Sequence, residues 1–357
     1  MKEITLCGYY GMCDSNGNSV GHSAKVAIEY AQLLEENYKV SIIASPCIIN
    51  KVKENSYEII QELPYNILTD VPHTLYKRIL DKYKIMRNAA LCLKKSTTEK
   101  LFFYHVDFFF FFYLYLFYHP KRSPKQIYCL IYHQEFTGGA VEKILQRIYK
   151  RALEKIDGVI YTQHGNRIDH RKTMWIPDYA YNEEYYSTFV SCEKKEKVIC
   201  LGTMNRYKEI DKLVHVFSNM NYPLEIVGRF EDEEKFQQLL KTKTSNITIR
   251  NEVISVEEYY KLLGEAKFSI LPYDMNQYSN RTSGVLLETI FLGSIPIAPS
   301  MLIEQNELYG MGYKDLTEIS SIDLNAIGAN AYEKERNKIL NEYGLNVISQ
   351  NMSEFFV

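Results

Sequence analysis

Short apolar segments alternate with segments of helical periodicity along the whole chain. In the first half, strands are expected at 4–8, 39–44, 101–104, 126–132, 158–162 and 174–177. Helices are expected at 22–34, over 76–100, beyond 107 and at 141–156. Strands that alternate with helices in this way predict a parallel sheet with crossover connections.

The same alternation starts again in the second half. Strands are expected at 197–201, 224–227, 247–250, 268–271 and 295–298, and helices at 210–219, 232–241, 256–266, 285–292 and 330–343. Two such series predict an α/β protein of two Rossmann-like domains that face one cleft. We expect an N-terminal domain at 1–178, a C-terminal domain at 179–340 that begins with a polar, tyrosine-rich linker (178–191), and a tail at 341–357 that packs back on the first domain.

The most apolar stretch of the chain, residues 101–118, allows two interpretations. It is nearly long enough to span a bilayer, but it contains His105 and Asp107, and its tyrosines are spread along it. A membrane span would exclude an unpaired aspartate and place its tyrosines at the ends. We therefore expect a buried strand, a turn at 105–107 and an aromatic helix, with a membrane-dipping element as the alternative.

Composition and charge describe a globular protein with an uneven charge distribution. The 357 residues are 46% hydrophobic and 24% charged, and residues 1–178 hold 24 Lys and Arg against 18 Asp and Glu. Much of this excess lies in the amphipathic helix expected at 76–100, which either rests on anionic lipid or is a solvated face. No secretory signal follows the first methionine, so we expect a cytoplasmic protein, with peripheral contact to the inner face of the membrane as an open alternative.

The cysteines point to neither a disulfide framework nor a zinc site. There are seven of them, scattered and without a C-x-x-C pair. We expect free thiols, most of them buried.

Two features of the first half are candidates for ligand contact. The loop at 9–21 follows a strand and carries Gly17, Asn18 and Gly21, but it lacks G-x-G-x-x-G, so it is either a ligand loop or a plain connection. His133 directly follows the strand expected at 126–132. It would therefore lie at the carboxyl end of a parallel strand, where α/β sheets bind ligands. A structural role for His133 remains the alternative.

The stretch 279–299 has the pattern of a phosphate-binding helix start. The turn with Arg281, Thr282, Ser283 and Gly284 leads into the helix expected at 285–292. The first turn of a helix carries partial positive charge and unpaired N–H groups, and Ser283 either caps it or binds the anion. Glu288 lies on the same face as Gly284 and could accept hydrogen bonds from two ribose hydroxyls, or be an ordinary solvated glutamate.

Taken together, these segments resemble the retaining glycosyltransferases of family 4 and their relatives with the GT-B fold. LGTMNRYKEIDKLVHVF (201–217) resembles the first loop and helix of their C-terminal domain, and SGVLLETIFLGSIPIAP (283–299) resembles their donor motif. GNSVGHSAKVAIEYAQLL (17–34) is similar to their acceptor-side glycine loop and helix, and IYH (131–133) to the strand that ends in a histidine. The resemblance covers nearly the whole chain.

The resemblance implies roles for individual residues. Lys208 matches the lysine that neutralises the donor diphosphate, and Arg206 could act beside it because Thr203 occupies the usual arginine position. Glu288 matches the second glutamate of the family motif, which holds the ribose. The first glutamate falls on Asn280, and this departure leaves open whether the reaction retains or inverts configuration.

The implied function is a glycosyltransferase of the hexosyl-transferring kind. It would move a sugar from a nucleotide diphosphate to a glycan or a lipid-linked acceptor in surface polysaccharide assembly, without nucleic acid as a partner. Arg206, Lys208 and the helix start imply that no metal cofactor is obligatory. His133 and His105 are expected to contact the transferred sugar, and an inverting enzyme would draw its base from His133, Asp14 or Glu135.

Two other functions remain compatible with the residues. One is a nucleotide-sugar epimerase on the same fold, and the other is a non-catalytic partner protein that retains the fold for interaction.

Overall fold

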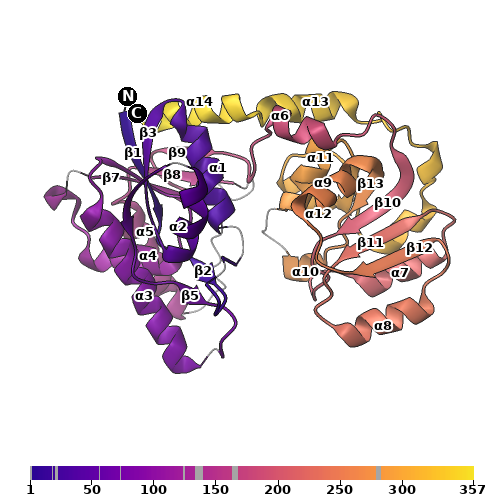
Figure 1. Cartoon of the computed structure of the whole chain (residues 1–357), viewed down its shortest axis with the longest axis horizontal. Coiled ribbons are helices and arrows are strands. Elements are labelled where there is room, and N and C mark those ends of the chain that lie inside the picture. Colours follow the sequence, from indigo (N-terminus) through magenta and orange to yellow (C-terminus); the bar gives the residue numbers. More distant parts are fainter. Residues whose placement is uncertain are drawn as a thin grey trace. The chain divides into compact units, whose positions relative to one another are not determined.

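The computed structural model describes residues 2–17, 19–20, 23–55, 57–72, 74–123, 125–132, 140–162, 168–278 and 283–357. These residues form two compact units, each described by itself below (Figure 1). The first unit takes in the described residues of Met1–Thr162 and of Asn166–Ile176 together with Asn346–Val357. The second takes in those of Pro177–Leu345.

The first unit is a parallel sheet with helices on its faces. Its elements are β1 (Lys2–Gly8), β2 (Met12–Cys13), α1 (Ser23–Glu35), β3 (Tyr38–Ala44), α2 (Pro46–Val52), η1 (Lys53–Asn55), β4 (Glu58–Glu62), β5 (Ile67–Leu68), α3 (Leu75–Lys95), β6 (Lys100–Phe103), α4 (Phe108–Phe117), η2 (Pro120–Arg122), β7 (Gln126–Ile131), α5 (Ala140–Leu153), β8 (Gly158–Tyr161), β9 (Thr173–Trp175) and α14 (Leu345–Phe355). Within the described residues the sheet has seven strands in the order β4-β3-β1-β6-β7-β8-β9, and every pairing in it is parallel. Such strands are covered on both faces, which explains their nearly continuous apolar sequences.

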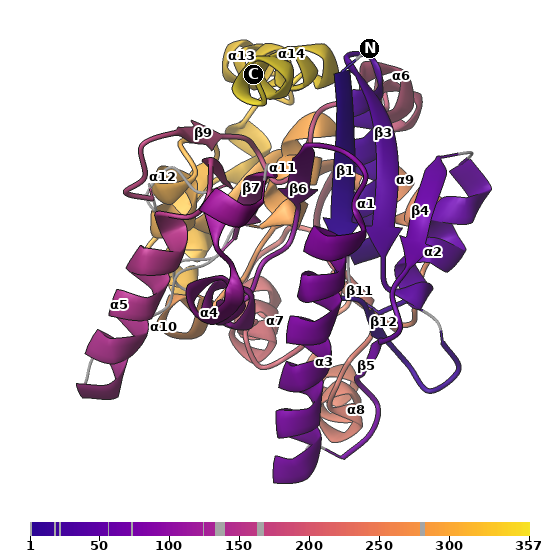
Figure 2. The same ribbon diagram turned by 90° about the vertical axis from the view of Figure 1, so that its left-hand side faces the viewer.

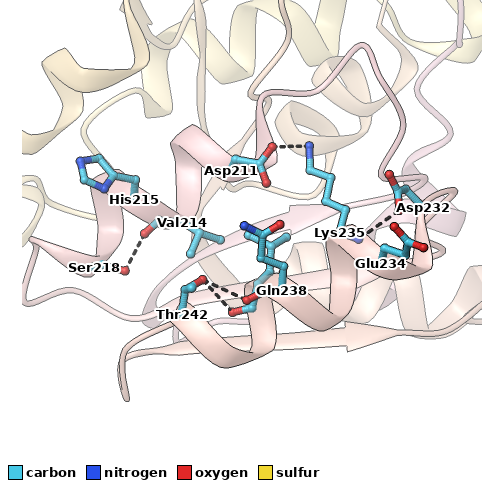
Figure 3. A pocket seen from close by; sticks show the side chains of 10 residues that line it. Asp211, Val214, His215, Ser218, Asp232, Glu234, Lys235, Gln238 and Thr242 are labelled. Carbon is cyan, nitrogen blue, oxygen red and sulfur yellow. Dashed lines mark hydrogen bonds and ion pairs between the residues drawn. The ribbon is translucent and has the colours of Figure 1, made fainter.

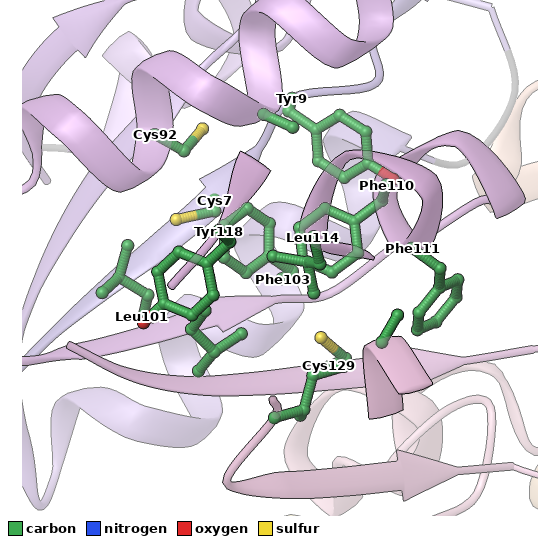
Figure 4. Packing of buried hydrophobic residues seen from close by; sticks show 14 of the residues in the cluster. Cys7, Tyr9, Cys92, Leu101, Phe103, Phe110, Phe111, Leu114, Tyr118 and Cys129 are labelled. Carbon is green, nitrogen blue, oxygen red and sulfur yellow. The ribbon is translucent and has the colours of Figure 1, made fainter. Parts of the chain in front are cut away.

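A core cluster of the first unit packs α3, α4 and α5 against one face of this sheet. Phe103 of β6 and Phe110 of α4 have ring centroids 4.6 Å apart, and Cys7, Cys92 and Cys129 lie in the same cluster (Figure 4). All seven cysteines are free and six are buried, as predicted. The stretch 101–118 forms the buried strand β6 and the helix α4, as its apolar pattern predicted. Within the described part of the chain, none of the helices has the length and apolar character needed to cross a membrane.

Helix α4 is held at both ends by polar side chains. Asp107 caps its start by accepting a hydrogen bond from the Phe110 amide at 3.1 Å. At its end, the Lys155 ammonium donates to the carbonyls of Leu114, Tyr115 and Tyr118 at 2.6, 2.9 and 2.8 Å. A cation on the last carbonyls satisfies groups that a helix leaves unpaired.

The C-terminal segment completes the opposite face of the first sheet. The ring of Phe356, just after α14, packs against Phe102 of β6 and Tyr128 of β7, with centroids 5.2 and 4.7 Å away. The Lys100 ammonium donates to the carbonyl of Phe356. Helix α14 therefore belongs to the first unit although it follows the second in sequence, and Figure 2 shows it from a second side.

The second unit repeats the architecture. Its elements are α6 (Glu183–Tyr186), η4 (Ser187–Phe189), β10 (Lys195–Leu201), α7 (Ile210–Ser218), β11 (Leu224–Gly228), α8 (Glu233–Thr242), β12 (Ile247–Asn251), α9 (Val256–Glu265), β13 (Ala266–Ile270), α10 (Met275–Tyr278), α11 (Gly284–Phe291), β14 (Ile295–Pro299), α12 (Ser300–Gln305), β15 (Met311–Tyr313), η5 (Leu316–Ser321), η6 (Leu324–Ala326) and α13 (Glu333–Glu342). Six strands among the described residues form a parallel sheet in the order β12-β11-β10-β13-β14-β15.

The segment 178–191 differs from the polar linker that its composition predicted. It contains α6 and η4, and Tyr186 in it is 4% exposed. The Tyr186 ring packs 5.2 Å from Phe291 of α11 and 5.5 Å from Tyr260 of α9. Tyrosine rings bury large apolar areas while keeping a polar tip, so a segment rich in tyrosine can be polar in composition and still form core.

Candidate functional site

The candidate site of the second unit lies where its strand order reverses. The chain runs outward from β10 through β11 to β12 and then returns to β13 on the other side of β10. Loops that follow two such neighbouring strands diverge at the carboxyl edge of the sheet, where open α/β sheets bind ligands. Here the loops are tied by two backbone hydrogen bonds, from Glu209 N to the Pro272 carbonyl (2.7 Å) and from Asp274 N to the Tyr207 carbonyl (2.9 Å).

Lys208 sits in this pair of loops as a buried cation. It is 8% exposed, its ammonium donates to the Leu201 carbonyl at 2.7 Å, and it stands 5.9 Å from the centre of the Tyr273 ring. Burial lowers the pKa of Lys208. No carboxylate forms an ion pair with it among the residues that the structure describes. A buried ammonium that has a carbonyl and an aromatic ring as partners is able to accept an anion.

Two glycines let the carboxyl ends of β10 and β11 come together behind Lys208. Gly202 has φ +94° and Gly228 has φ +154°, a region that favours glycine. A β-carbon on Gly228 would lie 1.9 Å from the Gly202 carbonyl oxygen. The loop that carries Lys208 is therefore held by backbone-to-backbone packing.

Tyr273 connects Lys208 to the start of α11. Its hydroxyl lies 3.4 Å from the Ser283 hydroxyl, and its ring stacks on Tyr278 with centroids 3.9 Å apart. Ser283 is 3% exposed and is the N-cap of α11, accepting from the Leu286 amide at 3.4 Å. The structure thus shows the capping role for Ser283 and brings Lys208, Ser283 and the positive end of α11 together.

The opposite end of α11 is satisfied by two other cations. The Lys194 ammonium donates to the Leu292 carbonyl at 2.9 Å, and Arg336 donates to the carbonyls of Ile290 and Phe291 at 2.9 and 2.8 Å. Burial, and then the charge of Arg336, lower the pKa of Lys194 to about 8.

Glu288 lies on α11 with its carboxylate held by two tyrosines of α9. The Tyr259 hydroxyl donates to Oε2 at 2.9 Å and the Tyr260 hydroxyl donates to Oε1 at 3.1 Å. Glu288 is 7% exposed. The ordinary solvated glutamate is therefore not what the structure shows, because this carboxylate is a buried acceptor in a hydrogen-bonded cluster.

Arg206 and Gly284 are neighbours of Lys208 and Ser283 in the sequence, but their surroundings in the structure differ. Arg206 is exposed; its guanidinium donates to the Tyr207 hydroxyl at 3.0 Å and stacks on that ring. At Gly284 the missing side chain makes room for Tyr179, whose ring atom would lie 2.4 Å from a β-carbon there.

The first unit has a corresponding edge at its own reversal point, between β1 and β6. The Tyr9 hydroxyl, after β1, donates to Oδ1 of Asp107, after β6, at 3.2 Å. His105 packs its ring 5.3 Å from Tyr10 and 5.7 Å from Tyr132. Burial raises the pKa of Asp107. His105 is thus placed at the carboxyl edge of the sheet among aromatic rings, where the strand pattern predicted it.

Gly17 and Asp14 belong to one turn of the loop that was predicted to face the acceptor. Gly17 has φ +83°, and its amide donates to the Asp14 carbonyl at 3.0 Å. The other predicted site residues, Asn18, Gly21, His133, Glu135, Asn280, Arg281 and Thr282, lie outside the described residues. No group of His, Cys, Asp or Glu side chains suited to a metal occurs in the part of the chain that the structure describes.

A separate depression of about 590 Å³ lies between α7 and α8 (Figure 3). An ion pair between Asp211 and Lys235 crosses it, and Asp232 caps α8 at its rim. Its lining does not include Lys208, Ser283 or Glu288.

Three tyrosines of the site were not predicted from the sequence. Tyr259, Tyr260 and Tyr273 could be suspected only from their positions, two on the helix before β13 and one just after that strand. With 30 tyrosines in the chain, the residue type itself carries little information.

Comparison with known proteins finds similarity at the level of structure. No family model and no curated protein sequence matches the chain. An α,α-trehalose-phosphate synthase (UDP-forming) from Burkholderia xenovorans superimposes with a TM-score of 0.64 and 8% identity, over 100% of both chains. AviGT4, a glycosyltransferase of avilamycin A biosynthesis, superimposes with a TM-score of 0.59 and 13% sequence identity, over 100% of this chain and 97% of its own. A putative UDP-N-acetylglucosamine 2-epimerase from Listeria monocytogenes superimposes with a TM-score of 0.55 and 12% sequence identity, over 99% of this chain and 95% of its own.

The chain has the GT-B fold. Its two parallel sheets and the full-length matches agree with two Rossmann-like domains, as the sequence predicted. In the GT-B fold of this chain, the reversal point of the second sheet carries Lys208 and the start of α11, and that of the first sheet carries Tyr9, His105 and Asp107.

Proposed function

We propose that this chain is a glycosyltransferase whose second domain binds a nucleotide diphosphate sugar. The observation that carries the proposal is the buried ammonium of Lys208 beside the capped start of α11, at the reversal point of the sheet. A cation and a helix N-terminus together suit a diphosphate, and Glu288 on the same helix suits a ribose. Glycosyltransferases are among the proteins of similar structure.

In the proposed reaction the bond between the sugar anomeric carbon and the β-phosphate oxygen breaks. The leaving diphosphate keeps the electron pair, a hydroxyl of the acceptor forms the new bond, and its proton goes to a base or to the departing phosphate. Lys208, Arg206 and the N-terminus of α11 would stabilise the leaving charge, so that no metal is obligatory. Asn280 stands in place of the first glutamate of the family motif. Whether the reaction retains or inverts the anomeric configuration is therefore to be determined from the product.

Binding of the nucleotide is the direct test of the donor site. Calorimetry with UDP, GDP and TDP is expected to give heat with at least one of them. Lys208→Met and Glu288→Ala should each weaken that affinity by about 1 to 3 kcal/mol, the scale of a hydrogen bond to a charged group.

Exposed residues of the same unit provide matched controls. Lys241→Met on α8 and Glu257→Ala on α9 remove the same charges from solvated positions and should leave the affinity unchanged. Absence of heat with all three nucleotides would instead favour a non-catalytic partner protein.

The acceptor side is proposed to take a glycan or a lipid-linked sugar, as in surface polysaccharide assembly with hexosyl transfer. Screening nucleotide sugars with and without such acceptors tests this, since a transferase needs the acceptor to form a product. A new nucleotide sugar formed without any acceptor would support an epimerase, the activity named for one protein of similar structure.

We further propose that α3 rests on an anionic membrane surface. Leu75, Ile79 and Tyr83 recur every four residues and are 75%, 64% and 53% exposed, so they form one apolar stripe on the face opposite the buried residues of the helix. Arg78 and Arg87, both exposed, flank the stripe on its two sides. Figure 2 shows α3 extending beyond the sheet of its unit.

This arrangement matches the chemistry of an anionic bilayer. Apolar side chains and tyrosine insert at the interface, and each cation near the surface contributes about 1 kcal/mol. The wild type is expected to float with vesicles that contain about one third phosphatidylglycerol, and to float much less with pure phosphatidylcholine or at high salt.

Ile79→Glu combined with Tyr83→Glu should abolish flotation. Val253→Glu, on an 83% exposed apolar residue of the second unit, is the control and should float like the wild type. A wild-type protein that does not float with any of these vesicles would contradict membrane docking.

A further inference from the structure

One aromatic side chain contacts both groups that the proposed donor site offers to a phosphate. Tyr273 lies shortly after β13, and its backbone forms an antiparallel bridge with Lys208. The centre of its ring is 5.9 Å from the Lys208 ammonium, within the range of a cation–π contact. Its hydroxyl is 3.4 Å from the hydroxyl of Ser283, the cap of α11. Tyr273 therefore connects the cation to the helix start.

The ring of Tyr273 is held in place and is uncharged. It is 7% exposed, and it stacks on the Tyr278 ring with centroids 3.9 Å apart and planes 3° apart. Burial raises the pKa of Tyr273 well above its ordinary value, so its hydroxyl keeps its proton at neutral pH. Lys208 therefore has a neutral ring with an electron-rich face beside it.

Lys208 depends on such a neighbour because it is a cation in a buried position. Burial disfavours its charged form and lowers the pKa of Lys208. Among the residues that the structure describes, its ammonium makes one hydrogen bond, to the Leu201 carbonyl at 2.7 Å, although an ammonium has three N–H donors. In the same part of the chain, the other titratable group that acts on Lys208 is the Cys200 thiol of β10. Burial raises the pKa of that thiol, so it is also uncharged at neutral pH.

An aromatic ring stabilises a buried cation in a different way from a carboxylate. A carboxylate would form an ion pair with Lys208 and take up its N–H donors. The face of a ring attracts the cation but carries no net charge, so it does not neutralise it. With the Tyr273 ring as its partner, Lys208 keeps its positive charge and its donors for an anionic ligand.

We propose that Tyr273 is a positioning residue that holds the Lys208 ammonium for the diphosphate of the donor. The inference rests on the proposed donor site and adds to it a residue from the loop after β13. Because the same side chain also touches Ser283, one ring sets the spacing between the cation and the start of α11.

The first test measures discrimination between a nucleoside diphosphate and the monophosphate of the same base. Calorimetry with UDP and UMP, or with GDP and GMP, gives the ratio of the two affinities for each variant. The wild type is expected to prefer the diphosphate roughly 10-fold or more, the scale of one hydrogen bond to a charged group. Tyr273→Leu removes the ring and should reduce this preference several-fold, mainly by weakening the diphosphate. Tyr273→Phe keeps the ring and loses only a long hydroxyl contact, so it should stay close to the wild type.

The second test measures how the affinity for the diphosphate depends on pH. As the pH rises from about 7 to about 10, the Lys208 ammonium loses its proton and the affinity falls. Loss of the ring removes a contact that favours the charged form, so the fall should begin at a lower pH in Tyr273→Leu, by roughly half a pH unit. The ligand titrates in the same way with every variant, so a difference between the profiles comes from the protein.

The same unit offers a matched control. Tyr222 is 3% exposed and precedes β11, so it lies at the opposite edge of the sheet from Lys208. Tyr222→Leu removes an equally buried ring and should leave both the diphosphate preference and the pH profile unchanged. Tyr273→Met provides a second variant without the ring, and thermal unfolding shows which of the compared proteins are folded.

The outcomes separate the inference from the proposed function. Folded Leu or Met variants with the preference and pH profile of the wild type would overturn the positioning role, and so would equal losses for diphosphate and monophosphate. A Tyr273→Phe variant as impaired as Tyr273→Leu would also overturn it, because the ring is then not what matters. A wild type that binds none of these nucleotides would instead overturn the proposed donor site.

Discussion

Replacing Gly228 by alanine is expected to destabilise the second unit strongly. The new β-carbon would lie 1.9 Å from the carbonyl oxygen and 2.7 Å from the carbonyl carbon of Gly202, and both are backbone atoms that cannot rotate away. Forcing atoms into a packed site costs about 1 to 3 kcal/mol, and a non-glycine residue in an unfavourable backbone region costs about as much again. With φ at +154°, Gly228 incurs both costs, so we expect a loss of about 2 to 6 kcal/mol.

Urea unfolding followed by circular dichroism measures this loss. Gly328→Ala is the control, because a β-carbon there meets nothing within 4 Å and its φ is not positive; it should be unchanged or up to about 1 kcal/mol more stable. Equal unfolding midpoints for the two variants would refute the idea that β10 and β11 depend on this close approach. Since the displaced loop carries Lys208, Gly228→Ala should also weaken nucleotide binding.

Three further changes test polar groups described above. Lys155→Met leaves three carbonyls at the end of α4 without their cation and should cost about 2 to 3 kcal/mol in urea unfolding; no loss would contradict the capping role. Asp107→Ala removes a helix cap and the acceptor of the Tyr9 hydroxyl and should cost about 2 to 4 kcal/mol, whereas Asp107→Asn, which still caps, should cost under about 1. The pKa of Lys194 is about 8 when folded, below the ordinary value of 10.5, so the unfolded chain binds more protons between these values. The free energy of unfolding should therefore rise with pH across that window relative to Lys194→Met, and parallel pH profiles would contradict the assignment.

The long elements could be predicted because the physics that forms them is local. Buried parallel strands such as β8 and β14 consist of apolar residues, and helices such as α7 and α9 show apolar residues at helical spacing. The two-residue strand β5 and the short helix α12 were not predicted, since so few residues carry no period.

The site was predictable in part for the same reason. The capping serine Ser283 and the apolar helix after it are recognisable in the sequence itself. The spacing of the helix then predicts that Glu288 lies on the same face as Gly284. The burial of Lys208 was not predictable, because a lysine in a polar loop gives no sign of it, and the surroundings that bury it come from β13 and its loop. The tyrosines that hold Glu288 depend in the same way on the packing of α9 against α11.

The position of α14 has a consequence for the order in which the chain can fold during synthesis. All residues of the second unit precede Asn346–Val357 in the sequence, so they leave the ribosome before that segment does. The first unit begins to emerge earlier, but the rings of Phe102 and Tyr128 lack their contact with Phe356 until the end of the chain is made. The unit whose synthesis begins first is therefore the unit that is completed last.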